Sequence, residues 1–330
     1  MKISDTAFSH GFCLRKNFFH FIIPAVLLFW MAGCSKEEPP RNLKELISEA
    51  LAGSVKADSI KANVLWLESM GTRFSLADNR RQVAVAIRNR FIRMGYSETR
   101  LDSFMINVTY RQVSYSLWQY NVIATLEGLV QDDTASIIGA HHDNILSSSS
   151  GDPFIKAYGA NDNASGVATV LEVARVMKKN NYIPKSRILF ITYAAEELGL
   201  KGSYAHSASA AEQNLKLRCM LNNDMVAFCP FTDKQNWIVN IIDYDNSHEL
   251  RLGAETLAKK YTCLKFINDN KYQKQSDSYP YSLKGYQALF FIGQAPDPNY
   301  HTLYDVSAAC NFDFCAEVVK LNCAILVEKN

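Results

Sequence analysis

Apolar residues recur along the chain in two patterns, one typical of helices and the other of strands. Helical spacing covers residues 41–53, 57–70, 77–96, 164–180, 247–261 and 312–327, and strand-like runs cover residues 101–108, 112–127, 136–140, 187–193, 218–223, 237–242 and 287–292. Asn163 is a candidate N-cap for the helix that follows it. Strands that alternate with helices predict an α/β fold, with a mostly parallel twisted central sheet and helices on both faces.

The first forty residues have a different pattern from the rest of the chain. Arg15 and Lys16 precede the apolar run 18–32, and Gly33, Cys34 and the polar run 35–40 follow it. We interpret residues 1–34 as a signal segment that ends in a lipid-modified Cys34. The sequence Met-Ala-Gly-Cys resembles a bacterial lipoprotein box, which implies a lipid anchor in the membrane of the cell envelope, periplasmic or surface.

Two alternatives to the lipid anchor stay open. A simple cleaved signal would give a secreted protein, whereas a retained anchor is disfavoured because the apolar run is short for a membrane span. In each case residues 35–40 are a polar linker, and residues 41–330 form one folded domain. No repeat and no second composition regime divides that domain.

Composition narrows the classes of partner. The chain has 330 residues, of which 48% are hydrophobic, and a net charge of +2. It can therefore bury a substantial core. Without a basic run, the chain has nothing to follow a phosphate backbone, so nucleic acid is excluded as an expected partner. The sequence leaves the oligomeric state unknown.

Cysteine usage fits export to an oxidising compartment. Beyond Cys13 and Cys34 there are six cysteines, and two of them, Cys219 and Cys229, flank Asp224. One hypothesis is a disulfide between Cys219 and Cys229, and the alternative is buried free thiols. No Cys-x-x-Cys pair occurs, which disfavours a zinc site made of thiolates.

Five polar residues stand where apolar runs give way to loops. They are His141, Asp162, Glu197, Asp224 and His301. In parallel sheets ligands bind beyond the carboxyl ends of the strands, so these side chains are expected to meet there. Two imidazoles and three carboxylates suit a pair of zinc-class ions.

The motifs around these residues resemble those of the co-catalytic zinc aminopeptidases, whose relatives include glutaminyl cyclases and glutamate carboxypeptidases. The matching segments are 140–143, 159–166, 195–199, 222–225, 276–280 and 300–302, in the family's order and with its spacing. The resemblance implies that Asp162 bridges two zinc ions. It also implies that His141 and Asp224 complete one site and that Glu197 and His301 complete the other.

The same resemblance implies two further catalytic residues. Glu196 would be the general base that takes a proton from the attacking water and passes it to the leaving amine. Asp143 would hydrogen-bond the imidazole of His141. We expect Glu196 and Glu197 to point in opposite directions, as neighbours on a strand do. For the same reason His142 is not expected to be a ligand.

The segment 276–281 departs from the family pattern, because Ser278 stands where relatives often carry His. We expect the segment to line the substrate pocket through Asp277, Tyr279 and Tyr281. His206, His248 and Tyr204 have no motif partners, and we expect them to be structural or surface residues. The Ser-rich loop 144–158 either gates the pocket or is a disordered surface loop.

Three functions are compatible with these residues. The first is a zinc-dependent exopeptidase, an aminopeptidase that removes N-terminal residues from peptides with two zinc ions. The alternative is a glutaminyl cyclase-like acyltransferase that uses one zinc ion and converts N-terminal Gln to pyroglutamate. A binding module that has lost its chemistry is disfavoured, because Glu196 and all five ligand positions are present.

Overall fold

The computed structural model describes residues 42–330 of the protein. The expected signal segment 1–34, with Cys34, and the linker 35–40 lie outside these residues. Among the helices that are described, none has the length and apolar character needed to cross a membrane.

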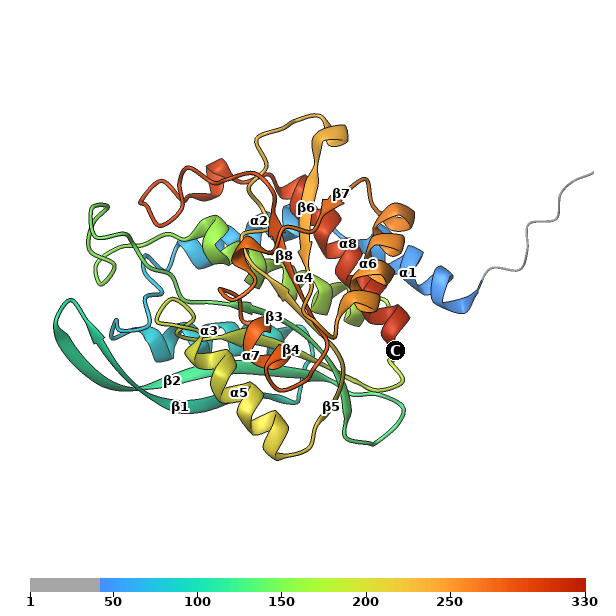
Figure 1. The fold of residues 1–330 in the computed structure, drawn as a ribbon, viewed down its shortest axis with the longest axis horizontal. Helices are drawn as coiled ribbons and strands as arrows, with labels where there is room; N and C mark the ends of the chain where they lie inside the picture. The colour runs from blue at the N-terminus through green and yellow to red at the C-terminus, as the bar shows by residue number, and fades with distance from the viewer. Residues whose placement is uncertain (1–41) are drawn as a thin grey trace, which may run out of the picture. The chain divides into compact units, whose positions relative to one another are not determined.

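A single mixed sheet of eight strands forms the centre of the fold (Figure 1). The strands are β1 (Thr99–Tyr110), β2 (Val113–Leu126), β3 (Thr134–His141), β4 (Arg187–Tyr193), β5 (Lys216–Asn223), β6 (Ile238–Ile242), β7 (Lys265–Ile267) and β8 (Ala288–Gly293). Their order is β1-β2-β4-β3-β5-β8-β6-β7. The α/β prediction is confirmed. The sheet is less parallel than expected, because β2, β6 and β7 run opposite to the central strands β4, β3, β5 and β8.

Each of the six predicted helices matches an observed one to within three residues at each end. The observed helices are α1 (Leu43–Ser54), α2 (Ala57–Glu68), α3 (Arg80–Arg93), α4 (Gly166–Lys179), α5 (Lys201–Glu212), α6 (His248–Tyr261), α7 (Ser278–Ser282) and α8 (Phe312–Lys329). The sequence did not predict α5, because its Ser- and Ala-rich sequence has no apolar stripe at helical spacing. The short elements α7 and β7 were also missed, because neither is long enough to establish a period.

Alternate residues of the central strands face two separate cores. On β3, Ile138 and Ala140 belong to the larger core, whereas Ala135 and Ile137 belong to the smaller one. Helices α3, α4 and α8 pack on the first face of the sheet, with α1 and α2 behind them, and α5 and α7 pack on the second (Figure 1). The expectation of helices on both faces is therefore confirmed.

A buried ion pair ties α4 to the junction between α1 and α2. The carboxylate of Glu172, which is fully buried, accepts hydrogen bonds from Arg175 Nε at 2.7 Å and from the main-chain N–H of Lys56 at 2.8 Å. Arg175 Nη2 also donates to the carbonyl of Ser54 at 2.8 Å. This ion pair belongs to the helical scaffold. Within the described part of the chain, it contacts none of the candidate ligands.

The cysteines of the described residues are all free thiols. Cys219 is fully buried on β5, and Cys229 is partly exposed in the loop that follows. The hypothesis of a bridge between them is therefore wrong. The alternative of free thiols describes this structure, so the loop that follows β5 must be held by other interactions.

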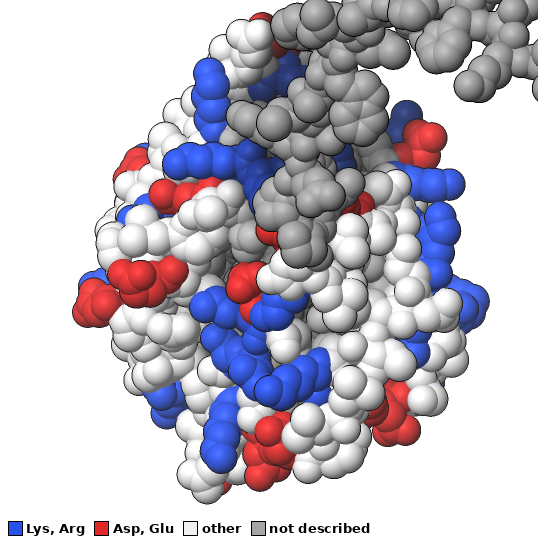
Figure 2. All heavy atoms as spheres, turned by 90° about the vertical axis from the view of Figure 1, so that its right-hand side faces the viewer, with Lys and Arg blue, Asp and Glu red and all other residues white. Residues whose placement is uncertain are grey.

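Charges of both signs occur side by side on the surface. On the face shown in Figure 2, Lys and Arg side chains are interspersed with Asp and Glu side chains. This mixture agrees with the net charge of +2. Because neighbouring opposite charges weaken each other's field, this face is poorly suited to steering one ionic partner.

Candidate metal centre and active site

The five candidate ligands converge at the carboxyl ends of the central strands. His141 ends β3, Asp162 lies in the helical turn Ala160–Ser165 before α4, Glu197 follows β4, Asp224 follows β5, and His301 lies in the loop after β8. All but His301, which is partly exposed, have little solvent contact. The sheet therefore brings together residues from five distant parts of the chain.

Asp162 stands between two groups of ligand atoms. Its Oδ1 lies 3.3 Å from His141 Nε2, and its Oδ2 lies 3.1 Å from His301 Nε2. Asp224 Oδ1 is 3.3 Å from His141 Nε2, and Glu197 Oε2 is 3.1 Å from His301 Nε2. In each triad the donor atoms lie within 4.8 Å of one another. A carboxylate with one oxygen in each triad has the geometry of a bridging ligand.

Unpaired atoms indicate that these residues fit metal ions. Glu197 Oε1 and His301 Nε2 are buried and make no hydrogen bond. Buried polar atoms are normally paired, and an ion is one of the explanations for an exception. Nitrogen and carboxylate donors at this spacing match the ligands that zinc accepts.

The turn Ala160–Ser165 also shapes the loop after β5. Asn161 Oδ1 accepts hydrogen bonds at 3.0 Å from the N–H groups of both Ala227 and Phe228, and Ser165 Oγ accepts one at 3.0 Å from Val226. These bonds fix the loop that begins at Asp224. They do the work that we had assigned to a disulfide bridge.

Ser165, and not Asn163 as expected, is the N-cap residue of α4, but the side chain of Asn163 still binds the first residue of the helix. Its Oδ1 accepts a hydrogen bond from the N–H of Gly166 at 2.8 Å. Gly166 is needed here because an added Cβ would collide with the main-chain oxygen of Asn223 as well as with Asn163 Oδ1. The close approach of α4 to the end of β5 brings the turn of Asp162 next to the loop of Asp224.

Asp143 has a role that the sequence did not predict. The Nδ1 atom of His141 lies 3.2 Å from the main-chain oxygen of Asp143 and 3.6 Å from its carboxylate. The carboxylate accepts hydrogen bonds from the N–H groups of Glu196 at 3.1 Å and Glu197 at 3.3 Å, and from Ser75 Oγ at 2.9 Å. Asp143 therefore orients both the imidazole and the backbone of the two glutamates.

The expectation that Glu196 and Glu197 face opposite ways is wrong. β4 ends at Tyr193, and Ala195 has a φ of 57°, so the pair lies in a turn and not on a strand. Both carboxylates face His141, and Glu196 Oε2 is 4.0 Å from its Nε2. The two neighbours thus contribute to one site.

Burial and like charges govern protonation in the site. Burial raises the pKa of Glu196 well above its ordinary value, and the charges of Glu197 and Asp277 add to this against the opposing effect of His141. Burial likewise raises the pKa of Glu197 to about 7. Burial lowers the pKa of His301, but its contacts with Asp162 and Glu197 outweigh this effect and raise that pKa to about 10. At neutral pH the metal-free site therefore holds a proton on His301.

Comparison with known proteins identifies the family. The model of "Peptidase family M28" matches residues 121–326. The chain belongs to peptidase family M28. Most of the matched segment lies in the sheet and in the loops that carry the candidate ligands.

Individual relatives match most of the length of this M28 chain, but at low sequence identity. Leucine aminopeptidase 1 of Metarhizium robertsii is 27% identical over 289 residues, which cover 84% of this chain and 71% of that protein. The structure of BSAP, a zinc aminopeptidase from Bacillus subtilis, is similar with a TM-score of 0.69 and 17% identity over 83% of this chain and 95% of that one. The glutaminyl cyclase of Bacteroides thetaiotaomicron has a TM-score of 0.66 and 18% identity over 83% and 98%.

The three residues that we expected to line the substrate pocket differ from one another in burial and in contacts. Asp277 is fully buried, neither of its oxygens makes a hydrogen bond, and burial raises its pKa to about 7. Tyr279 is partly exposed and stacks on Tyr244 with ring centroids 6.3 Å apart.

Tyr281 is fully buried in the smaller core. Its hydroxyl lies 2.8 Å from the hydroxyl of Tyr193 and 2.6 Å from His206 Nδ1. A ring without solvent contact does not line a substrate pocket, so the structure contradicts that expectation for Tyr281. His206 is a buried structural residue, within the range of roles that we expected.

Tyr300 is a residue of the site to which sequence reasoning gave no role. Its ring stacks on the imidazole of His301, with centroids 3.7 Å apart and an angle of 20° between the planes. The side chain is 49% exposed. Its position directly before a ligand was the only signal available in the sequence.

The Ser-rich loop 144–158 is anchored at several points. Phe154 packs edge-on against Phe74 with centroids 5.0 Å apart, and Thr72 Oγ1 donates to the carbonyl of Pro153 at 2.6 Å. The N–H of Ser147 donates to the carbonyl of His301 at 2.9 Å. These contacts order the loop, which contradicts the alternative of a disordered surface loop. Gating of the pocket by this loop stays a prediction.

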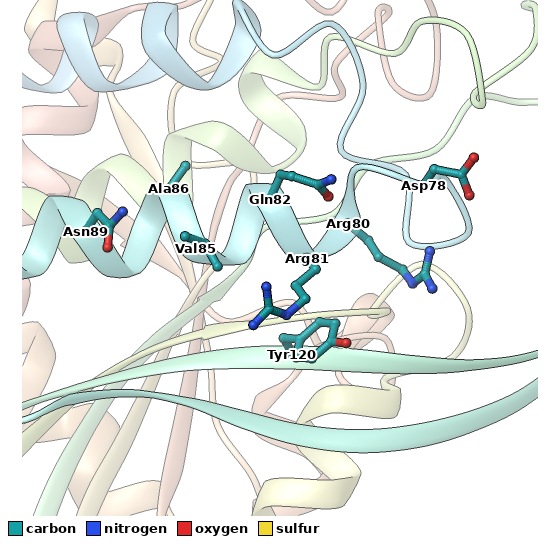
Figure 3. Close-up of a pocket in the computed structure, with 8 residues that line it drawn as sticks. All are labelled: Asp78, Arg80, Arg81, Gln82, Val85, Ala86, Asn89 and Tyr120. Atoms are coloured by element: carbon teal, nitrogen blue, oxygen red, sulfur yellow. The ribbon is translucent and has the colours of Figure 1, made fainter.

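Two surface hollows lie away from the candidate ligands. One, of about 510 Å³, lies between α3 and β2, where Arg81 extends over the ring of Tyr120 at 5.8 Å (Figure 3). The other, of about 610 Å³, lies beside α5 and includes His206. Neither is lined by a candidate ligand, so the chemistry of the site comes from its donor set and not from the size of a cavity.

The contact between α4 and β5 makes a testable prediction. We expect Gly166→Ala to lower the free energy of unfolding by about 1–3 kcal/mol, because the added methyl group meets a main-chain oxygen that cannot rotate away. Urea denaturation of the metal-free protein measures this. Gly253→Ala is the matched control, because its Cβ meets nothing within 4 Å and α6 should gain about 0.5–1 kcal/mol. Equal effects of the two changes would contradict the role given to Gly166.

Proposed function

We propose that this protein is a zinc-dependent exopeptidase, and specifically an aminopeptidase that hydrolyses the N-terminal residue of peptides. The observation that carries the proposal is the pair of ligand triads that share Asp162, with the carboxylate of Glu196 beside them. Membership of a peptidase family supports hydrolysis of peptide bonds. The name leucine aminopeptidase carried by relatives supports the exopeptidase.

In this proposal the chain holds two zinc ions. His141, Asp162 and Asp224 hold one, and Asp162, Glu197 and His301 hold the other. Bound zinc would lower the pKa of a water molecule and polarise the scissile carbonyl. Asp143 fixes the tautomer of His141 by accepting its Nδ1–H through the main-chain oxygen.

Glu196 is the general base in this proposal. Its carboxylate lies next to both triads and is 12% exposed, so substrate and water can reach it. Burial and like charges raise its pKa well above the ordinary value, and the positive charge of two bound zinc ions would favour the ionised form that a general base needs. It can therefore take a proton from the attacking water and give it to the leaving amine.

Two aromatic residues with exposed surface are the candidates for contact with the substrate in this proposal. Tyr300 offers an exposed aromatic face beside His301, on which a substrate side chain can pack. Tyr279 is partly exposed on α7 and stays a candidate for the same role. Asp277 has no solvent contact, so we propose that it acts through the charge that it places near Glu196.

A glutaminyl cyclase-like acyltransferase is the second candidate. The similarity of the fold to the Bacteroides thetaiotaomicron glutaminyl cyclase favours it. A single zinc ion would suffice for this reaction, in which the substrate's own amine attacks its side-chain amide and ammonia leaves. Complete donor sets in both triads favour the aminopeptidase.

We further propose that Cys34 carries a lipid that anchors the protein in the cell envelope, on the basis of the apolar run and the Met-Ala-Gly-Cys sequence. Cells that express the protein should incorporate an alkyne-labelled fatty acid into it, and Cys34→Ala should abolish the label. Cys13→Ala is the control, since it should leave the label in place. Undiminished label in the Cys34 variant would contradict the anchor.

Glu196→Gln tests the catalytic proposal. We expect turnover of a Leu-led peptide to fall by about 10² to 10⁴-fold, because the amide cannot accept the proton. Zinc content by elemental mass spectrometry and the melting temperature should stay as in the wild type. The same change at Glu212, which is exposed at the end of α5, is the control. Full activity in Glu196→Gln would rule out the general base.

The proton on His301 predicts how zinc stabilisation depends on pH. In the metal-free protein the pKa of His301 is raised to about 10, so this proton stabilises the fold fully below about pH 6.5, the ordinary pKa. The stabilisation is lost as the pH rises toward 10. The raised pKa of Glu197, about 7, has the same sign. Zinc must displace these protons, so its binding strengthens as the pH rises.

We therefore expect saturating zinc to raise the melting temperature more at pH 8 than at pH 6. Differential scanning fluorimetry with and without zinc at the two pH values measures this difference. His248→Gln, which changes an exposed histidine outside the site, should leave the difference unchanged. A rise that is equal at both pH values, or larger at pH 6, would contradict the protonation assigned to the site.

A further inference from the structure

Arg73 is a buried cation whose guanidinium group binds main-chain oxygens. The residue is 2% exposed. Its Nε donates to the carbonyl of His142 at 2.8 Å, its Nη1 to Tyr158 at 2.7 Å and its Nη2 to Gly159 at 2.7 Å. Burial lowers its pKa to about 10, so the group stays charged at neutral pH. Burying such a charge is costly, and the hydrogen bonds to these carbonyls offset part of that cost.

Asp305 is a second buried ionisable residue that binds main-chain groups of the same loop. It is 2% exposed, and burial raises its pKa to about 7. One carboxylate oxygen accepts the N–H of Asn161 at 2.7 Å, and the other accepts the N–H of Asp162 at 2.9 Å. Its main-chain oxygen accepts the N–H of Ala160 at 3.1 Å. Three successive N–H groups thus point to one residue.

The loop 158–162, which Arg73 and Asp305 both contact, has little conformational freedom. Gly159 has a φ of 53°, and an added Cβ would lie 2.9 Å from Arg73 Nη2 and would collide with the main-chain oxygen of Asp162. A cation therefore fixes the carbonyls before Asp162, while the carboxyl group of Asp305 fixes the N–H groups that lead into it. The same two residues reach other ligands, because His142 follows His141 and Asp305 lies in the loop of His301.

We propose that Arg73 and Asp305 form a clamp that holds Asp162 in its bridging position before zinc binds, and that this clamp sets the affinity for both ions. The inference rests on the proposed zinc site. Neither residue is a ligand or touches substrate, so both are positioning residues. Because the clamp prepares the shared ligand in advance, binding need not restrict the loop.

Zinc affinity of the full chain tests the clamp. Dissociation constants are measured by competition with a chromogenic chelator in wild type, Arg73→Met, Arg73→Lys and Asp305→Asn. We expect both constants to rise by about 10 to 100-fold in the methionine and asparagine variants, as is typical when residues behind a ligand are changed. Lysine keeps the charge but loses the planar fork, so it should restore only part of the affinity.

Arg175→Met is the matched control. Like Arg73→Met, it removes a guanidinium group that binds a main-chain oxygen. Arg175, however, lies in the scaffold, where it also binds the buried carboxylate of Glu172. We expect Arg175→Met to lower the melting temperature of the metal-free protein while leaving both zinc constants as in the wild type. This comparison separates a positioning role from a general loss of stability.

Two outcomes would overturn the clamp. One is wild-type zinc affinity in a folded Arg73→Met or Asp305→Asn variant, and the other is an equal loss of affinity in Arg175→Met. If Arg73→Met does not fold, Asp305→Asn decides, because it keeps the shape of the side chain. Failure of the proposed function is a different result, since the wild-type protein itself would then bind no zinc.

Discussion

Repulsion among buried carboxylates is the constraint on which the site depends. Asp162, Glu197 and Asp224 converge on two imidazoles, and Glu196 lies beside them, so they cannot all be ionised in this space without added positive charge. The metal-free protein meets the constraint with protons, which is why the pKa of His301 rises to about 10. Two divalent ions would meet it without protons. Because bound ions would relieve this repulsion, we expect the site to bind metal tightly.

The sheet and the loops after its strands have separate tasks. Parallel central strands bring the loops to one edge, as in other open α/β sheets. Hydrogen bonds then fix the position of each loop closely enough for its side chain to reach the site. Examples are the bonds from the loop after β5 to Asn161 and Ser165. Asp143 does the same for the two glutamates. Most of these bonds join a side chain to main chain, so they fix backbone position rather than charge alone.

The sequence was sufficient to find five residues that the structure brings together and most of the helices and strands, and insufficient wherever the outcome depends on tertiary contacts. Apolar runs that end in His141 or Asp224 carry their own signal, because strand and strand end are both visible. The direction of Glu197 depends instead on the positive φ of Ala195, which no spacing reveals. We wrongly placed Tyr281 in the pocket, because an aromatic residue beside a motif gives the same sequence signal whether it lines a pocket or packs in a core. Arg73 and Asp305 act through main-chain atoms far away in sequence, so no local pattern could find them.

The measurement that tests the central claim most directly is mass spectrometry of peptides incubated with the purified, zinc-loaded protein. One peptide is led by Leu, and a second is identical but led by Gln. The account predicts release of the leading residue from the Leu-led peptide, with no release after chelation. Loss of ammonia from the Gln-led peptide alone, with its chain intact, would contradict the aminopeptidase and indicate a glutaminyl cyclase.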